Sequence, residues 1–207
     1  MMLLKLCGNP VPFNTRYTTN VRRGTVTIIC GCMFSGKTTE LLRRLSRYAP
    51  QSVLTLKHEI DRRYRADAVV AHAGESRPAV VIGSAYQGLR HIAPDTKVVG
   101  LDEAHFFDMT LIEVAQSLAA RGTDVILTSL DRDSWGRSFP VCEQLCRIAD
   151  EYLPKYAVCA TCGAVADRTQ RLTPIVDGQM VGGPESYEAR CAKCWRPPPE
   201  ARPLAWP

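Results

Sequence analysis

The sequence predicts an α/β fold in which a mostly parallel sheet has helices on both faces and a small lobe follows at the C-terminus. From residue 25 onward, short β-rich runs alternate with amphipathic helical patterns, which is typical of a parallel sheet covered by helices. After residue 153 the hydrophobic runs shorten and two C-x-x-C pairs appear. The length of 207 residues suits one such domain with an extra lobe.

The expected elements follow in chain order. Residues 25–30 form a buried strand, and residues 38–49 form a helix that Pro50 ends. Leu41, Leu42 and Leu45 share one face of that helix with Tyr48. Further strands are expected in the runs SVLTL, VVAHA, AVVIG, KVVGLD and DVILTSL, and further helices over 84–92, 108–121 and 140–152.

Composition excludes several classes of protein. With 45% hydrophobic and 23% charged residues the chain is neither collagen-like, nor a long disordered segment, nor a coiled coil. No apolar stretch approaches the roughly 18 residues that a membrane span needs. An odd count of nine cysteines without a secretory signal favours a reducing compartment, the cytoplasm, and a metal site over a disulfide framework.

The net charge of +5 belongs to the ends of the chain. Residues 1–24 carry four basic side chains and no acidic one, and we expect a flexible basic extension there, although such a start also permits an organelle transit peptide. Residues 196–207 are a proline-rich tail. Between these ends, basic and acidic side chains balance, so charge gives no support for binding to nucleic acid. We assign 25–153 to an ATP-binding domain and 154–195 to a zinc-binding lobe.

A phosphate-binding motif lies between the first strand and the first helix. Residues 31–38 fit G-x-x-x-x-G-K-[ST] at every fixed position. Glycines let backbone N–H groups converge on phosphate oxygens, Lys37 reaches the β- and γ-phosphates, and the Thr38 hydroxyl binds Mg²⁺. The motif predicts a P-loop, RecA-like domain whose ATP-binding residues include Gly31, Cys32, Met33, Phe34, Ser35, Gly36, Lys37 and Thr38.

Two carboxylates end a later strand. In KVVGLDE, Asp102 is expected to support Mg²⁺ across the sheet from the loop. Glu103 would project beyond the carboxyl end of the strand, where a general base can act on a bound nucleophile. The letters of residues 102–105 also match a helicase DEAH box, but a helicase of that type needs two motor domains, for which the chain has no room.

The C-terminal cysteines have the spacing of a zinc site. Cys159 and Cys162 form one C-x-x-C pair, and Cys191 and Cys194 form a second, so four thiolates are predicted to bind one structural Zn²⁺. A nucleic-acid-binding ribbon is the competing interpretation. The remaining cysteines of the predicted α/β domain, Cys30, Cys32, Cys142 and Cys146, are interpreted as core residues, and His58, His72 and His91 as structural or surface residues.

Taken together, the motifs of residues 25–195 resemble the zinc-containing thymidine kinases, of the cellular and bacterial type rather than the herpesvirus type. The resemblance rests on GCMFSGKTTELLRR, IDRRY followed by HAG, LDEAHFF, LDRD with SFP, CATCG with ADRTQRL, and VGGPESYEARCAKC. It implies ATP-dependent phosphorylation of the 5′-hydroxyl of thymidine, and of deoxyuridine, in nucleotide salvage. It also implies a homotetramer or homodimer, feedback inhibition by thymidine triphosphate, and neither nucleic acid nor membrane as a partner.

Carried over by motif position, the resemblance makes Glu103 the general base. It adds Asp61, Arg63, Asp102 and His105 to the ATP site, with Arg63 supplying positive charge. A lasso-like loop over 163–190, pinned by zinc, would cover the nucleoside. The substrate-binding residues would be Met33, Phe106, Leu130, Phe139, Thr169, Gly178, Gln179, Met180, Val181, Gly182 and Tyr187.

Three positions depart from the family pattern. His105 replaces the usual Gln, Ser129 stands where Gly is common, and Ser134 stands where an aromatic residue usually follows Asp. Loss of that aromatic ring would enlarge the base pocket unless Trp135 fills the space, so substrate preference is affected more than reaction type. Two other functions fit fewer of the motifs: a P-loop ATPase whose zinc lobe binds nucleic acid, and a non-catalytic nucleotide-binding regulator.

Overall fold

The computed structural model describes residues 22–61, 67–71, 74–174, 181–199 and 201. Its centre is a six-stranded sheet in the order β5-β2-β6-β7-β1-β8, in which every neighbouring pair is parallel. The predicted parallel sheet is therefore confirmed. The strands are β1 (Val26–Gly31), β2 (Val53–His58), β5 (Val80–Ile82), β6 (Val98–Asp102), β7 (Asp124–Ser129) and β8 (Glu151–Lys155).

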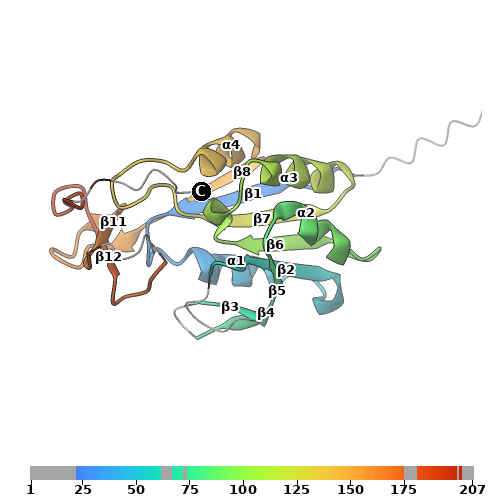
Figure 1. Ribbon diagram of the computed structural model, residues 1–207. Helices are drawn as coiled ribbons and strands as arrows, with labels where there is room; N and C mark the ends of the chain where they lie inside the picture. Colours follow the sequence, from blue (N-terminus) through green and yellow to red (C-terminus); the bar gives the residue numbers. More distant parts are fainter. Residues whose placement is uncertain (1–21, 62–66, 72–73, 175–180, 200, 202–207) are drawn as a thin grey trace, which may run out of the picture.

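Helices cover both faces of this sheet, as predicted. Figure 1 shows α2 (Ala85–Gly88), α3 (Thr110–Ala120) and α4 (Pro140–Ile148) together along one side. Successive side chains along each buried strand point to opposite faces of the sheet. Ile28 of β1 joins the core that contains α3 and α4, whereas the next residue, Ile29, packs with Leu41 and Leu45 of α1 (Lys37–Leu45). Short 3₁₀ turns complete the domain: η1 (Pro50–Ser52), η2 (Leu89–His91) and η3 (Ala104–Phe106).

Helix α1 lies so close to the sheet that one strand position must be glycine. A Cβ atom on Gly100 of β6 would lie 2.5 Å from Cδ1 of Leu45, which is fully buried. The apolar face predicted for α1 is confirmed, because Leu41, Leu42 and Leu45 are buried and Tyr48 is half-buried. The helix ends at Leu45 rather than at residue 49, because the N–H groups of Arg47 and Tyr48 bond carbonyls three residues back and wind the chain into a tighter turn.

The predicted helix over 140–152 is wrong in its last turn. Helix α4 ends at Ile148, and Glu151 begins β8, which pairs with β1 at the edge of the sheet. The Asp150 carboxylate accepts the backbone N–H of Val26, which fixes the chain in the extended conformation. Pro154 lies within this strand, where an edge position tolerates a residue without an N–H. The sheet therefore continues to Lys155, two residues beyond the expected domain boundary.

The C-terminal lobe consists of two antiparallel ribbons at one end of the sheet (Figure 1). They are β9 (Ala157–Val158) with β10 (Val165–Ala166), and β11 (Arg168–Arg171) with β12 (Tyr187–Arg190). A small buried cluster joins Ala166 and Ala189 of the lobe to Cys32 of the phosphate-binding loop. A third hairpin, β3 (Ala68–Val70) with β4 (Ser76–Pro78), flanks β2. Within the described ranges, no helix combines the length and apolar character that crossing a bilayer requires.

Candidate functional site

The phosphate-binding loop connects β1 to α1 with backbone angles that few residues adopt. Gly31 lies so near β8 that a Cβ atom would be 2.2 Å from the Lys155 carbonyl oxygen. Gly36 has a φ of 77° at the start of α1. The Ser35 hydroxyl and the Lys37 ammonium each donate to the Cys32 carbonyl oxygen at 2.8 Å. The loop is therefore a compact ring with its lysine held over it, which is the arrangement that surrounds a phosphate chain.

A hydroxyl and a carboxylate face each other at the start of α1. The Thr38 hydroxyl lies 3.3 Å from both oxygens of Asp102 at the carboxyl end of β6. Asp102 is buried, and the Thr128 hydroxyl of β7 also donates to it. A hard divalent cation prefers oxygen ligands of this kind. The donor set thus fits the Mg²⁺ ion that accompanies a nucleoside triphosphate.

Glu103 follows Asp102 in a strained conformation. Its φ of 56° is in the left-handed region, which glutamate rarely adopts. Its backbone N–H donates to the Thr128 hydroxyl at 3.0 Å, so β7 holds the strained peptide in place. Within the described ranges, Phe34 of the phosphate-binding loop is the other non-glycine residue with positive φ. Both strained residues line the same pocket, and backbone strain of this kind gathers at functional sites.

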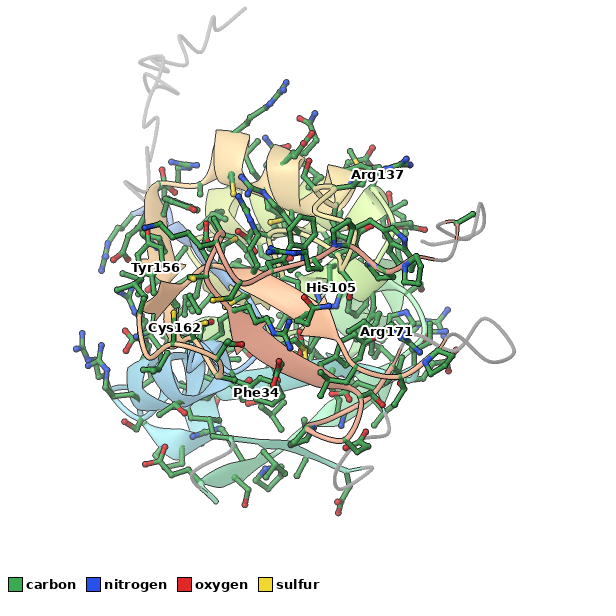
Figure 2. All side chains as sticks on the ribbon, turned by 90° about the vertical axis from the view of Figure 1, so that its left-hand side faces the viewer. Phe34, His105, Arg137, Tyr156, Cys162 and Arg171 are labelled. Carbon is green, nitrogen blue, oxygen red and sulfur yellow. The ribbon has the colours of Figure 1, made fainter. Side chains whose placement is uncertain are left out.

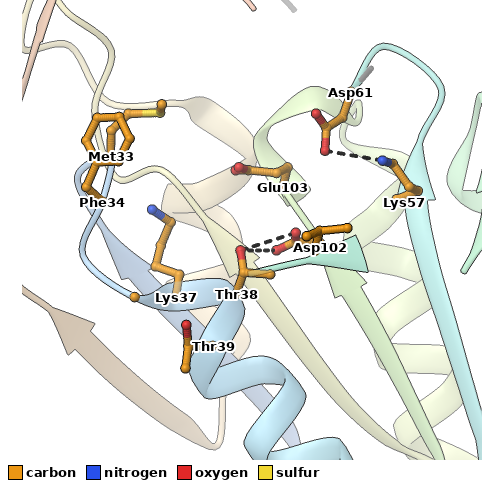
Figure 3. A pocket seen from close by; sticks show the side chains of 11 residues that line it. Met33, Phe34, Lys37, Thr38, Thr39, Lys57, Asp61, Asp102 and Glu103 are labelled. Carbon is orange, nitrogen blue, oxygen red and sulfur yellow. Dashed lines mark hydrogen bonds and ion pairs between the residues drawn. The ribbon is translucent and has the colours of Figure 1, made fainter. Parts of the chain in front are cut away.

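That pocket, about 150 Å³ in volume, lies between the loop and the ends of β2 and β6 (Figure 3). Two buried residues of opposite charge line it opposite the loop: Lys57 at the end of β2 and Asp61, whose Oδ2 lies 3.6 Å from Lys57 Nζ. Lys57 was not predicted from the sequence. The available signal was a lysine next to the end of an otherwise apolar strand, in register with Asp102. Arg63 lies outside the described residues.

A second, more apolar pocket adjoins the first, and Met33 lines both. It brings together all the predicted nucleoside-binding residues that the structure describes. Gly178, Gln179 and Met180 lie outside the described residues. His105, which was expected in the ATP site, lines this second pocket and not the first. The complete lining is Met33, His105, Phe106, Leu130, Asp133, Ser134, Phe139, Thr169, Val181, Gly182 and Tyr187.

His105 is fully buried between aromatic rings near the centre of the lobe-facing side in Figure 2. Its ring centroid lies 4.3 Å from that of Phe106 and 4.9 Å from that of Phe139. The Leu130 backbone N–H donates to Nδ1 of His105 at 3.3 Å, and the same nitrogen lies 3.4 Å from Oε2 of Glu103. The histidine therefore connects the carboxylate of the first pocket to the walls of the second.

The unusual Ser134 faces the second pocket. It is buried and lines the pocket, whereas Trp135 is not among the lining residues. The Trp135 backbone N–H instead bonds the Asp133 carboxylate at 2.9 Å. Of the two outcomes expected from the sequence, the arrangement agrees with the first: Trp135 does not take the place of the missing aromatic ring in the lining of this pocket.

Contacts from the lobe complete the second pocket. The Met33 backbone N–H donates to the Thr169 hydroxyl at 3.1 Å, which joins the phosphate-binding loop to β11. The Trp195 indole N–H donates to the Thr169 carbonyl oxygen at 3.2 Å. Arg171 donates to the Tyr187 hydroxyl at 2.5 Å, with its guanidinium 5.2 Å from that ring's centroid. These bonds fix Thr169 and Tyr187, two of the lobe residues that line the pocket.

Beyond this wall, the four C-terminal cysteines converge as predicted. The sulfurs of Cys159, Cys162, Cys191 and Cys194 all lie within 4.8 Å of one another and can hold a metal ion. Two thiolates on a tetrahedral zinc ion, each about 2.3 Å from it, are about 3.8 Å apart. The Sγ atoms of Cys162 and Cys191 are 3.7 Å apart. A hydrogen bond from the Cys191 backbone lowers the pKa of Cys159 to about 6, which favours the thiolate that a metal requires.

Comparison with known proteins gives one consistent result. The family model of thymidine kinases matches residues 24–195. Thymidine kinase of Rhodothermus sp. is 43% identical over 177 residues, which cover 84% of this chain and 83% of the relative. Thymidine kinase of Bdellovibrio bacteriovorus is 42% identical over 187 residues, covering 89% and 91%. That of Roseiflexus castenholzii is 43% identical over 188 residues, covering 84% and 95%.

Among solved structures, the Legionella pneumophila ATPase DotB aligns with 70% of this chain and 44% of its own. Its identity is 16% and its TM-score is 0.40, a likeness too low to support an argument.

Proposed function

The chain belongs to the thymidine kinase family, and from this premise we propose that it transfers the γ-phosphoryl group of ATP to the 5′-hydroxyl of thymidine. The observation that carries the proposal is the junction of the two pockets. The first has the basic and phosphate-loop groups that a triphosphate needs, the second has apolar walls that suit a thymine methyl group, and Glu103 lines the first beside His105 of the second.

The proposed mechanism divides the work among a few side chains. The backbone of residues 31–38 holds the triphosphate, and Lys37 neutralises charge on the group being transferred. Glu103 accepts the proton of the 5′-hydroxyl as that oxygen approaches the phosphorus. Lys57 lines the same pocket and adds positive charge opposite the loop. Because phosphoryl transfer passes through a loose transition state, positioning and charge neutralisation carry most of the rate.

Thr38 and Asp102 would hold Mg²⁺, which supplies further charge neutralisation on the phosphate oxygens when it is bound. Their direct contact supports this assignment. Cys159, Cys162, Cys191 and Cys194 would hold a structural Zn²⁺ ion, supported by their four converging sulfurs. Zinc would fix the ends of the segment 163–190, and with them the ribbon of β11 and β12 that carries Thr169 and Tyr187 toward the nucleoside. Arg63, by its motif position, would add positive charge at the phosphates.

The family also suggests the setting of the reaction. We propose that the enzyme acts in thymidine salvage in the cytoplasm, as a homotetramer or homodimer with feedback inhibition by thymidine triphosphate. Deoxyuridine is the expected second substrate, since the backbone at 178–182 would bond the polar edge that both bases share. Ser134 at the pocket wall supports a site that also tolerates larger groups on the base. Most of the predicted basic extension, residues 1–21, lies outside the described residues, but Gly24 at its end is buried and its backbone N–H donates to the Ala119 carbonyl oxygen at 2.8 Å.

The test is phosphorylation of each deoxynucleoside by the zinc-loaded protein with ATP and Mg²⁺. We expect thymidine and deoxyuridine to be phosphorylated and purine deoxynucleosides to be rejected. Glu103→Gln keeps the size of the side chain and removes the base, so the turnover number should fall by about 10²- to 10⁴-fold while ATP still binds. A near-normal turnover number would remove Glu103 as the base. DNA-stimulated ATP hydrolysis without nucleoside phosphorylation would replace the proposal with a nucleic-acid-dependent ATPase.

A further inference from the structure

Three cysteines outside the C-terminal lobe bring their sulfurs together behind the phosphate-binding loop. Cys30 is in β1, directly before Gly31, and Cys142 and Cys146 are one turn apart on α4. Sγ of Cys30 lies 3.3 Å from that of Cys142 and 3.9 Å from that of Cys146, and all three sulfurs lie within 4.8 Å of one another. Two elements distant in sequence thus direct three thiols to one point.

This convergence is closer than a place in the core requires. Cys30 and Cys142 are buried, as the sequence predicted, but apolar packing does not require the sulfurs to face one another. Thiolates bound to one metal ion at about 2.3 Å lie about 3.8 Å apart in tetrahedral geometry and about 4.0 Å apart when three surround the ion in a plane. The 3.9 Å between Cys30 and Cys146 lies in this range, the 3.3 Å between Cys30 and Cys142 is shorter, and 3.7 Å separates two sulfurs in the C-terminal cluster.

The donor atoms indicate the class of ion. Within the described part of the chain, the group contains three cysteines and no histidine, aspartate or glutamate ligand. Structural zinc sites are almost always completed by four protein ligands, whereas a donor set of thiolates alone selects soft ions such as Cu(I). Cys146 is partly exposed, which gives an ion a path of entry.

We propose that Cys30, Cys142 and Cys146 form a second metal site, separate from the C-terminal cysteine cluster, which binds one Cu(I) ion. A bound ion would connect α4 to β1 one residue before the phosphate-binding loop. Helix α4 directly follows Phe139, which lines the second pocket. The ion would therefore link a helix beside the second pocket to the strand that leads into the phosphate-binding loop of the first.

The test uses the full-length, zinc-loaded protein under reducing, oxygen-free conditions. Cu(I) is supplied as its coloured complex with bicinchoninate, and transfer to the protein is followed by loss of the colour while released zinc is measured in parallel. The variants are Cys146→Ser, a mild change at a partly exposed position, and Cys142→Ala. The control is Cys32→Ala, which removes a buried cysteine of the phosphate-binding loop whose sulfur belongs to neither group of converging cysteines; only its metal binding is compared.

The wild type and Cys32→Ala should each withdraw one Cu(I) per chain and keep their zinc. Cys146→Ser and Cys142→Ala should bind Cu(I) at least about tenfold more weakly. Loss of a residue that only hydrogen-bonds a metal ligand already weakens metal binding by about tenfold, and loss of the ligand itself should cost at least as much. Cu(I) should also raise the melting temperature of the wild type but not of folded Cys146→Ser. The proposal is overturned if the wild type takes up no Cu(I), if both variants match the wild type, or if zinc release accounts for all the copper bound.

Discussion

Thr128 holds both carboxylate-bearing residues at the end of β6, Asp102 and Glu103, and its hydroxyl can be removed almost without change of shape. It is fully buried in β7, accepts the Glu103 backbone N–H at 3.0 Å and donates to the Asp102 carboxylate. Thr128→Val keeps the branched side chain and abolishes both bonds. The substitution therefore asks how much a single hydroxyl contributes to stability and to the placement of the base.

Its expected cost follows from the two bonds. A buried N–H without a partner costs about 1–3 kcal/mol, and a hydrogen bond to a charged group contributes about 1.5–3 kcal/mol. Thr38 still contacts Asp102, so the second loss is partial, and we expect the free energy of unfolding to fall by about 2–4 kcal/mol in total. Glu103 also loses the bond that holds its left-handed peptide. A displacement that costs the transition state about 1.4 kcal/mol lowers the turnover number about tenfold.

Urea denaturation measures the first effect, and the turnover number with saturating thymidine and ATP measures the second. Thr128→Ser is the matched control, because it keeps the hydroxyl and loses only a methyl group. It should stay within about 1 kcal/mol of the wild type, near the value of one buried methylene. The reasoning fails if Thr128→Val keeps the stability and turnover number of the wild type, or if Thr128→Ser loses as much of either.

Three further predictions concern packing, pH and the lobe. Gly100→Ala should lower the free energy of unfolding by about 1–3 kcal/mol, because the added methyl group crowds Leu45. Leu45→Val relieves that crowding, so it should cost less stability in the Gly100→Ala protein than in the wild type. Losses that simply add in urea denaturation would contradict this. Hydrogen bonds from Arg43 and Arg44 lower the pKa of Glu40 from 4.5 to about 2. The ionised Glu40 carboxylate therefore contributes its full share to the stability of the folded protein above pH 4.5, and this contribution is lost as the pH falls toward 2. The difference in stability between wild type and Glu40→Gln should therefore shrink over that range, and a constant difference in denaturation at stepped pH would refute it. Removing metal with a chelator should raise the KM for thymidine more than the Kd for ATP, because the lobe lines only the second pocket; equal changes would count against the pocket assignment.

The sequence alone was enough to predict those parts of the site in which a short motif determines its own backbone conformation. The phosphate-binding loop, the end of β6 and the C-x-x-C pairs each place a few residues through local turns, so the contact between Thr38 and Asp102 and the four converging sulfurs could be expected. Lys57 could not be expected in the same way. A single lysine near the end of a strand gains meaning only when the register places it beside Asp102, and a single strand does not specify its neighbour.

Pattern also failed at the edge of the sheet. The amphipathic period of α4 gives no sign of its end at Ile148, and the following strand β8 has mostly exposed or half-buried side chains and includes a proline. What makes it a strand is pairing with β1 across more than a hundred residues, together with the Asp150 bond to the Val26 N–H. Tertiary contacts determine the secondary structure of such segments, and those contacts cannot be inferred from the local pattern of a single sequence.

The division between the two pockets explains why one fold can keep its chemistry and vary its substrate. Every residue that lines the first pocket belongs to the sheet domain, whereas Thr169, Gly182 and Tyr187 of the second come from the lobe. The strained peptides at Phe34 and Glu103 lie in the first pocket, where their cost is met by the buried sheet around them. Under the proposed function, a change in the second pocket, such as serine at residue 134, would alter the fit of the base without disturbing that strain. Under the proposed function, substrate choice would therefore depend on the second pocket, which the sheet domain and the lobe form together, and phosphoryl transfer would depend on the first, which the sheet domain forms alone.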